Sequence, residues 1–411
     1  MLGRATRWLD VSLLLVLAAM GLQVIPLPLD LLARIAPGTI AFKRIMTVAP
    51  IQSRSQSISV DPQATTTALL LVGALMLAFW ATRTALGCGG LRWLSRWIAM
   101  IGLVVAVVGI AQHLTMVPIL DLIWPVTRRD LRPWGPFVNR NDYSGWLLLA
   151  VMVTLGYLVA RLQARHQHGE PFDPERAFDD TGTRLAVALC LMTAGIMVSL
   201  SRSGLLGLAI GMITFLLIIQ RDVSARRLRR LAIALLVLVG IAGLFANFGL
   251  LSARLEAIGS EGLGSRLAEW RQIIPMALDF WPVGAGVGSF GRVMPFYQTS
   301  TVLITISHAD NELLQTIAEG GALVGIPVAL VLVTGIALVW KRLRDDRSAM
   351  FAIRAGAASG LVAIAVQNMF EMTLRVPATG LLFATLAAIA MHVRPSSGTN
   401  GGHRHRAAAT H

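Results

Sequence analysis

The chain has 411 residues, of which 55% are hydrophobic and only 14% are charged, and its mean hydropathy is +0.66. A soluble domain has about a quarter of its residues charged, so this composition excludes soluble domains, intrinsic disorder and collagen. Two cysteines, Cys88 and Cys190, provide neither a disulfide framework nor a metal-binding motif. The net charge of +14 comes from short arginine clusters between apolar runs, which is typical of a polytopic membrane protein and not of a nucleic-acid partner.

Apolar stretches long enough to cross the core of a bilayer recur along the chain. Hydropathy therefore predicts an all-α polytopic membrane protein with about ten transmembrane helices, and up to twelve remain compatible with the sequence. The predicted spans are 11–29, 64–82, 97–117, 143–160, 185–201, 203–219, 231–251, 312–340, 355–372 and 376–393. Because so many spans follow, the first is interpreted as an uncleaved signal anchor.

Lysine and arginine predict the orientation, because they collect in cytoplasmic loops. With a cytoplasmic N-terminus, 22 of the 36 Lys and Arg residues lie in inner segments, including the short loops RDVSARRLRR and KRLRDDR. Both termini are therefore expected to be cytoplasmic. We expect residues 1–393 to form a single helical membrane domain that includes an outer loop at 252–311. Residues 394–411 are expected to form a flexible basic tail.

The first polar motif at the outer face is RPWGPFVNRNDYSGW, just before the fourth span. Asn141 or Asp142 can cap that helix by accepting a hydrogen bond from a free N–H group. Arg140, between Asn139 and Asn141, offers donors to an anion or a sugar. The alternative is a capped helix with an interfacial belt of aromatic residues.

The second motif is SLSRSG, the tight outer turn that contains Arg202. An arginine between two apolar helices is costly near lipid unless it faces water, protein or an anion. The alternative is a side chain that only extends to the lipid headgroups. An arginine without another role would fit the charge bias better at the inner face, so a functional role is favoured for Arg202.

The third motif, GSRLAEWRQIIPMALDFWPVGAGVGSF, lies in the long outer loop. Ser265 is a natural N-cap, which places Arg266 in the first turn, where the helix dipole and a guanidinium together suit a phosphate. Arg271 follows on the same segment, and contact with lipid headgroups is its alternative role. Apolar residues at helical spacing predict an amphipathic interfacial helix: Leu267, Trp270, Ile274 and Leu278.

The fourth motif, SHADNELLQTIAEGGALVG, enters the eighth span. Ser307 can cap this helix with Asp310 three residues on, which puts His308 in the first turn. There the positive helix end favours neutral imidazole, which suits a general base. A polar stripe of Asn311, Gln315 and Glu319 follows. For Glu319 a structural carboxylate bonded to neighbouring helices is favoured.

A fifth group of polar residues lies near the outer end of the ninth span: Gln367, Asn368, Glu371 and Arg375. Glu371 and Arg375 are four residues apart, so a structural ion pair on one helix is predicted.

Four of these stretches resemble the O-antigen ligase/polymerase family of bacterial envelope glycosyltransferases: GPFVNRNDYSGWL, LSRSGLLGL, GSRLAEWRQIIPMALDFWPVGAGVGSF and HADNELLQTIAEGGALVGI. They cover roughly positions 135–326, and the first 130 residues match only in hydropathy. The resemblance implies a multi-pass enzyme of the bacterial inner membrane with a periplasmic active site. By resemblance, Arg202 and Arg266 match the arginines thought to hold the pyrophosphate, and His308 the histidine thought to activate the acceptor.

The implied donor is a saccharide on undecaprenyl pyrophosphate, and the implied acceptor is lipid A–core, a growing polysaccharide or, in related enzymes, a protein. An inverting transfer is expected, with no metal or other cofactor, because two arginines can neutralise the leaving group. Asn139, Arg140, Asn141, Arg271, Asp310, Asn311 and Glu319 are candidate supporting residues. A solute transporter is the alternative from another class, although its ionisable residues would be spread through the membrane depth.

Overall fold

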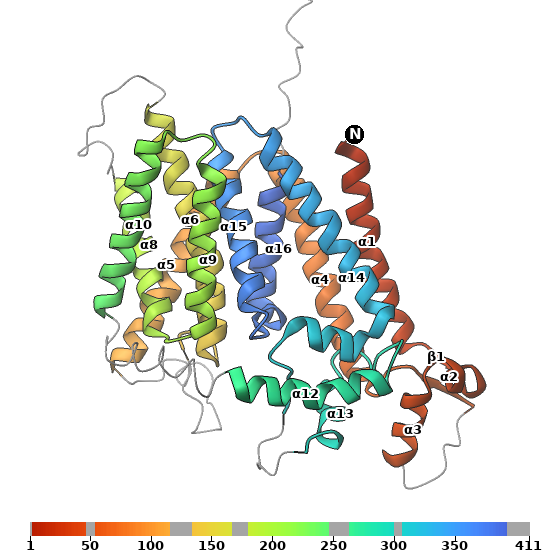
Figure 1. Cartoon of the computed structure of the whole chain (residues 1–411). Coiled ribbons are helices and arrows are strands. Elements are labelled where there is room, and N and C mark those ends of the chain that lie inside the picture. Colours follow the sequence, from red (N-terminus) through yellow and green to blue (C-terminus); the bar gives the residue numbers. More distant parts are fainter. Residues whose placement is uncertain are drawn as a thin grey trace, which may run out of the picture.

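The computed structural model describes residues 2–46, 54–115, 134–166, 180–245, 263–299 and 306–392. Within these ranges the chain is almost entirely helical. Long helices stand side by side, and shorter elements gather below their lower ends (Figure 1). The predicted tail 394–411 lies outside the described residues.

The long helices run alternately up and down through this bundle, as expected of a polytopic membrane protein (Figure 1). Their bounds are α1 Leu2–Val24, α4 Pro62–Gly87, α5 Leu91–Thr115, α6 Arg140–His166, α8 Asp180–Val198, α9 Arg202–Ile219, α10 Ala225–Phe245, α14 Glu312–Asp345, α15 Phe351–Gln367 and α16 Pro377–Met391.

The short elements form a layer at the lower end of the bundle (Figure 1). Strand β1 pairs antiparallel with β2, and Leu27 lies opposite Gln56. The bounds are β1 Pro26–Pro28, α2 Leu29–Ile35, α3 Pro37–Met46, β2 Ser55–Ser57, α12 Leu263–Asp279, α13 Phe290–Val293, and the 3₁₀ helices η3 Met294–Phe296 and η4 Thr373–Arg375.

Each of the ten predicted spans coincides with one long helix, and seven of these are long and apolar enough to cross a membrane. Helices α15 and α16 are apolar but shorter, and α10 begins with a run of arginines. The first span was placed too far along the chain, because α1 ends at Val24 and the following Pro26 and Pro28 belong to a strand. Prolines at those positions cannot continue a helix.

Helix α6 lies at the centre of the bundle and packs against α5, α8, α9, α15 and α16. Its residues 147–152 are fully buried, on all sides of the helix. Glycines allow α15 to approach closely: a Cβ on Gly156 would lie 2.4 Å from the Ala352 carbonyl, and one on Gly356 would lie 2.3 Å from the Met152 carbonyl. Such contacts between small residues are the usual way in which membrane helices associate.

Helix α14 contains a kink that holds the segment after α12 in place. Gly321 has a φ of +56° inside the helix. The freed N–H of Ala322 donates to the Pro282 carbonyl over 2.7 Å, and the N–H of Gly286 donates to the Glu319 carbonyl over 2.8 Å. The kink therefore ties the lower layer to a membrane helix, directly beside Glu319.

Replacing Gly321 by alanine should destabilise the protein by about 2–4 kcal/mol, because a left-handed φ and a backbone clash are both penalised. The added Cβ would lie 2.3 Å from the Pro282 carbonyl oxygen. Gly325→Ala is the matched control, since that position in the same helix has nothing within 4 Å. Thermal unfolding in detergent measures both variants, and equal midpoints would contradict the role given to the kink.

Candidate active site

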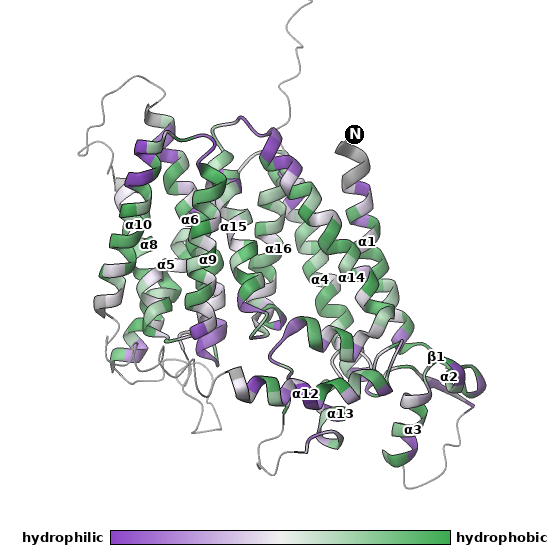
Figure 2. Cartoon of the chain, viewed as in Figure 1, coloured by the Kyte–Doolittle hydropathy of each residue, from purple (hydrophilic) through white to green (hydrophobic). Residues whose placement is uncertain are grey.

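Polar residues from five segments meet at the lower end of the bundle. They come from the starts of α6 and α9, from α12, from the segment before α14 and from the turn after α15. Figure 2 shows hydrophilic residues at the lower end of α9 and along α12, below helices that are otherwise apolar. This gathering brings together stretches that lie more than 200 residues apart in the sequence.

Arg202 is the first residue of α9 and is half-buried. Ser201 caps this helix, because its hydroxyl accepts a hydrogen bond from the N–H of Gly204. Ser199 and Ser203 are also buried, and both hydroxyls bond to the protein. Among the described residues, no hydrogen bond or ion pair engages the guanidinium of Arg202. The serines thus serve the turn, and the arginine is available to a ligand.

Arg266 lies in the first turn of α12, as predicted, although the helix already includes Leu263 and Ser265 is therefore not its N-cap. Its Nη2 donates to Glu371 Oε1 over 2.9 Å, and its Nη1 donates to the Phe370 carbonyl. The guanidinium carbon also lies 6.0 Å from the centre of the Phe370 ring. Arg266 is thus held against the turn that follows α15.

Glu371 connects the two arginine-bearing segments. It is 7% exposed and accepts hydrogen bonds from Arg266 over 2.9 Å and from Ser203 Oγ over 3.4 Å. Burial raises the pKa of the Glu371 carboxyl, and the hydrogen bond and charge of Arg266 oppose that shift. The predicted pair of Glu371 with Arg375 is wrong, because α15 ends at Gln367 and the two residues do not share a helix.

His308 is exposed and precedes α14 in a non-helical segment. Two hydrogen bonds hold the backbone of the next residue, Ala309. Trp270 of α12 donates to its carbonyl over 3.0 Å, and its N–H donates to the Gln315 side chain over 2.8 Å. The predicted cap at Ser307 is wrong. Helix α14 begins at Glu312, and Asn311 caps it by accepting from the N–H of Leu314. His308 therefore lies outside the first turn of α14, away from the position that the sequence predicted for it.

The charge of Asp310 interacts with the charges of both His308 and Arg266. Burial raises the pKa of its carboxyl, and the charges of Arg266 and His308 oppose that shift. Its φ of +45° prevents the helix from starting earlier. Glu269 of α12 also interacts with Asp310 and Arg266. Glu371 thus connects the segments of Arg202 and Arg266 by hydrogen bonds, and the charge of Asp310 interacts with those of Arg266 and His308.

The first polar motif supplies the fifth segment of this site. Helix α6 begins at Arg140, and the side chain of Asn139 accepts from the N–H of Asn141 over 3.0 Å, so Asn139 caps the helix in place of the predicted Asn141 or Asp142. Gln367 at the end of α15 donates to the Asn141 carbonyl over 2.9 Å. Asn139 is exposed and Arg140 is half-buried.

Glu319 is fully buried and holds several elements together. It accepts from the N–H of Phe290 over 3.1 Å, from Gln315 over 3.2 Å and from Arg375 over 2.8 Å. Arg375 also donates to Glu312 over 3.0 Å. The structural role favoured for Glu319 is confirmed. The other residues of the polar stripe also bond within the protein, because Asn311 donates to the Met369 carbonyl and Gln315 donates to Glu319.

Replacing Glu319 by alanine should cost about 3–5 kcal/mol of stability, because it removes a fully buried carboxylate from a half-buried arginine and from the N–H of the buried Phe290. Glu312→Ala is the matched control. It removes the other carboxylate from Arg375, but Glu312 is partly exposed and Glu319 remains. Thermal unfolding in detergent should show a much larger loss for the Glu319 variant. Similar losses for both would contradict this assignment.

The structure does not bring Arg271 into the cluster. Its side chain is exposed, on the outer part of α12 together with Leu267, Ile274 and Leu278. Three residues of the predicted apolar stripe are thus exposed, whereas its fourth, Trp270, is half-buried, and Ile273 and Met276 on another face are fully buried. Helix α12 thus has one apolar face packed on the protein and a second that is open. In the described part of the chain, no group of three or more His, Cys, Asp or Glu side chains could hold a metal ion.

Residues 187–329 match the model of a protein family described as O-antigen ligase. The matched stretch includes Arg202, Arg266, His308 and Glu319, and it ends before Glu371. No match was found among curated proteins.

Proposed function

We propose that this chain, which matches the O-antigen ligase family model over residues 187–329, transfers a saccharide from undecaprenyl pyrophosphate to a saccharide acceptor at the periplasmic membrane surface. The observation that supports this proposal is that the segments of Arg202 and Arg266 are joined at one end of an apolar helical bundle by Glu371, which accepts hydrogen bonds from Ser203 and Arg266. The segment of His308 lies close by, because the charge of Asp310 interacts with those of Arg266 and His308. A lipid-linked anion reaches such a site from the membrane, and a sugar acceptor reaches it from the aqueous side.

The two arginines are suited to the pyrophosphate by their positions as well as by their charge. Arg202 opens α9 and Arg266 lies in the first turn of α12, so each is close to the positive end of a helix. Guanidinium groups donate paired hydrogen bonds to phosphate oxygens. In the proposed complex, Arg202 and Arg266 bind the pyrophosphate and stabilise the negative charge that develops when it leaves.

His308 is proposed as the general base. Its imidazole takes the proton from the acceptor hydroxyl, and the oxygen forms a bond to the anomeric carbon of the donor sugar. The bond between that carbon and the pyrophosphate oxygen breaks, and its electron pair leaves with undecaprenyl pyrophosphate. Attack from the side opposite the leaving group inverts the anomeric centre. Asp310 is proposed to stabilise the imidazolium, because the charges of the two residues interact.

Turnover by the purified protein in liposomes tests the proposal. A synthetic polyprenyl-pyrophosphate oligosaccharide is supplied with lipid A–core, or with a second lipid-linked repeat, as acceptor. Transfer to lipid A–core indicates a ligase, and transfer to the second lipid-linked repeat indicates a polymerase. Because arginines supply the positive charge, transfer should continue in excess EDTA at more than about half the rate. Absence of product with both acceptors would contradict the proposed reaction.

A further inference from the structure

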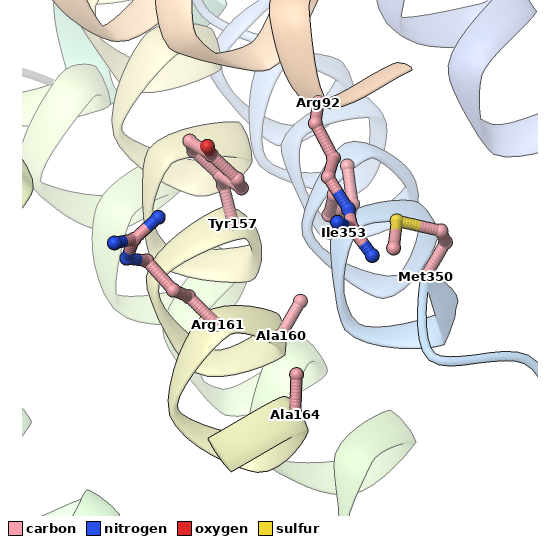
Figure 3. Close-up of a pocket in the computed structure, with 7 residues that line it drawn as sticks. All are labelled: Arg92, Tyr157, Ala160, Arg161, Ala164, Met350 and Ile353. Carbon is pink, nitrogen blue, oxygen red and sulfur yellow. The ribbon is translucent and has the colours of Figure 1, made fainter. Parts of the chain in front are cut away.

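A cavity of about 220 Å³ lies at the opposite end of the bundle from the candidate active site. It is formed where the start of α5, the end of α6 and the start of α15 meet. Its lining residues are Arg92, Tyr157, Ala160, Arg161, Ala164, Met350 and Ile353 (Figure 3). Two arginines and a phenol thus line a cavity whose remaining walls are apolar.

The arrangement of the side chains leaves room for a ligand between positive groups. Figure 3 shows Arg92 from α5 on one side and Tyr157 and Arg161 from α6 on the other. Ala160 and Ala164 are one turn apart on α6, and their small side chains keep the space between open. Two guanidinium groups and a phenol hydroxyl are hydrogen-bond donors that suit an anion with several acceptor oxygens, such as a phosphate.

Helix ends add to the positive charge. Arg92 is in the first turn of α5, and Met350 is the residue that precedes α15, so the N-terminal ends of both helices face the region. Four exposed arginines also lie at the same end of the bundle, in the first two turns of α10: Arg226, Arg227, Arg229 and Arg230. A surface of this kind attracts the anionic headgroups of a membrane leaflet.

Two exposed tryptophans indicate the depth of the cavity in the membrane. Trp93 and Trp97 are 66% and 50% exposed, and their rings contact edge to face on the outside of α5, beside Arg92. Tryptophans with one side free are typical of the level of the lipid headgroups. The cavity is therefore at a depth where phosphate groups of lipids are concentrated.

We infer that this cavity binds a phosphate-bearing anion between Arg92 and Arg161, and its position favours the headgroup of an anionic phospholipid as the source. Bound there, the lipid joins α5, α6 and α15 at the end of the bundle that lacks the active site. The inference is independent of the transfer reaction, because none of the lining residues belongs to the candidate active site.

The test uses the full-length protein, freed of lipid in detergent, with phosphatidylglycerol as the probe in native mass spectrometry. The double variant Arg92→Gln/Arg161→Gln should bind the lipid at least tenfold more weakly than the wild type. Arg96→Gln/Arg226→Gln is the matched control, since it removes two positive charges at the same end of the bundle from exposed residues that do not line the cavity. It should bind within about twofold of the wild type. Equal losses in the double variant and the control would overturn the inference.

A second variant guards against a folding defect. Ala164→Leu keeps both arginines but fills the space beside them, and it should also weaken binding at least tenfold while the unfolding temperature stays near that of the wild type. A further measurement adds inorganic phosphate to the lipid-binding experiment. Competition by phosphate at millimolar concentration, lost in the double variant, would assign the cavity to a soluble phosphate compound. Unchanged lipid binding in Ala164→Leu and no effect of phosphate would reject the site.

Discussion

Replacing His308 by alanine is expected to lower the rate of saccharide transfer by about 10²–10⁴-fold, the usual contribution of a general base. Binding of the donor should change less than about threefold, because the imidazole acts on the acceptor. The measurement is single-turnover transfer in liposomes, together with donor binding under the same conditions. A loss confined to the chemical step is the expected signature of the proposed role.

The structure makes this variant informative, because the His308 side chain is exposed and its removal leaves no cavity. The hydrogen bonds of Trp270 and Gln315 to the backbone of Ala309 do not involve the imidazole, so the segment should keep its place. Ser307→Ala is the control, since this exposed neighbour does not cap α14. Wild-type transfer by the His308 variant would exclude it as the base.

The helices were predictable because hydropathy acts over whole segments. About 20 apolar residues in a row identify a span whatever its neighbours are, and every predicted span corresponds to a helix. Boundaries depend on single side chains and were less predictable. Asn139 and Asn311 cap α6 and α14, whereas nearby Asn141 and Ser307 have equally suitable side chains. The sequence alone does not distinguish such neighbours.

Partners distant in the chain could not be predicted from local spacing. Glu371 and Arg375 have the spacing of a helical ion pair, but α15 ends before Glu371 and Arg375 belongs to the 3₁₀ helix η4. Each pairs with a residue more than 50 positions away. Glu371 was thus missed as part of the site. The one signal was its place beside other polar residues at the outer end of an apolar helix.

Replacing Arg266 by alanine is expected to weaken donor binding and transfer by about 10²–10³-fold, because a charged donor to the leaving group is lost. Arg271→Ala is the matched control, from the same helix but with an exposed side chain outside the cluster. Binding is measured with a polyprenyl-pyrophosphate oligosaccharide in detergent. Equal effects of the two variants would show that the charge of α12, and not the position of Arg266, attracts the donor.

The replacement Glu371→Gln should have the opposite effect on donor binding. Without donor, the carboxylate of Glu371 pairs with Arg266 at 2.9 Å, so it occupies a hydrogen-bonding position that a pyrophosphate oxygen needs. Glutamine has the same shape without the charge, and it should strengthen donor binding about threefold to tenfold, since the competing charge-assisted bond is weakened.

The pH dependence of donor binding shows whether Glu371 competes with the donor for Arg266 or only holds Arg266 in position. Burial raises the pKa of Glu371 above its usual 4.5, so the carboxylate takes up a proton as the pH falls through that raised value. Protonation weakens its pairing with Arg266, and wild-type donor binding should therefore strengthen on acidification. A pyrophosphate esterified at both ends keeps its charge over this range. Glu371→Gln should lose this part of the pH dependence. If that variant instead binds the donor as weakly as Arg266→Ala, Glu371 positions the arginine for the donor and does not compete with it.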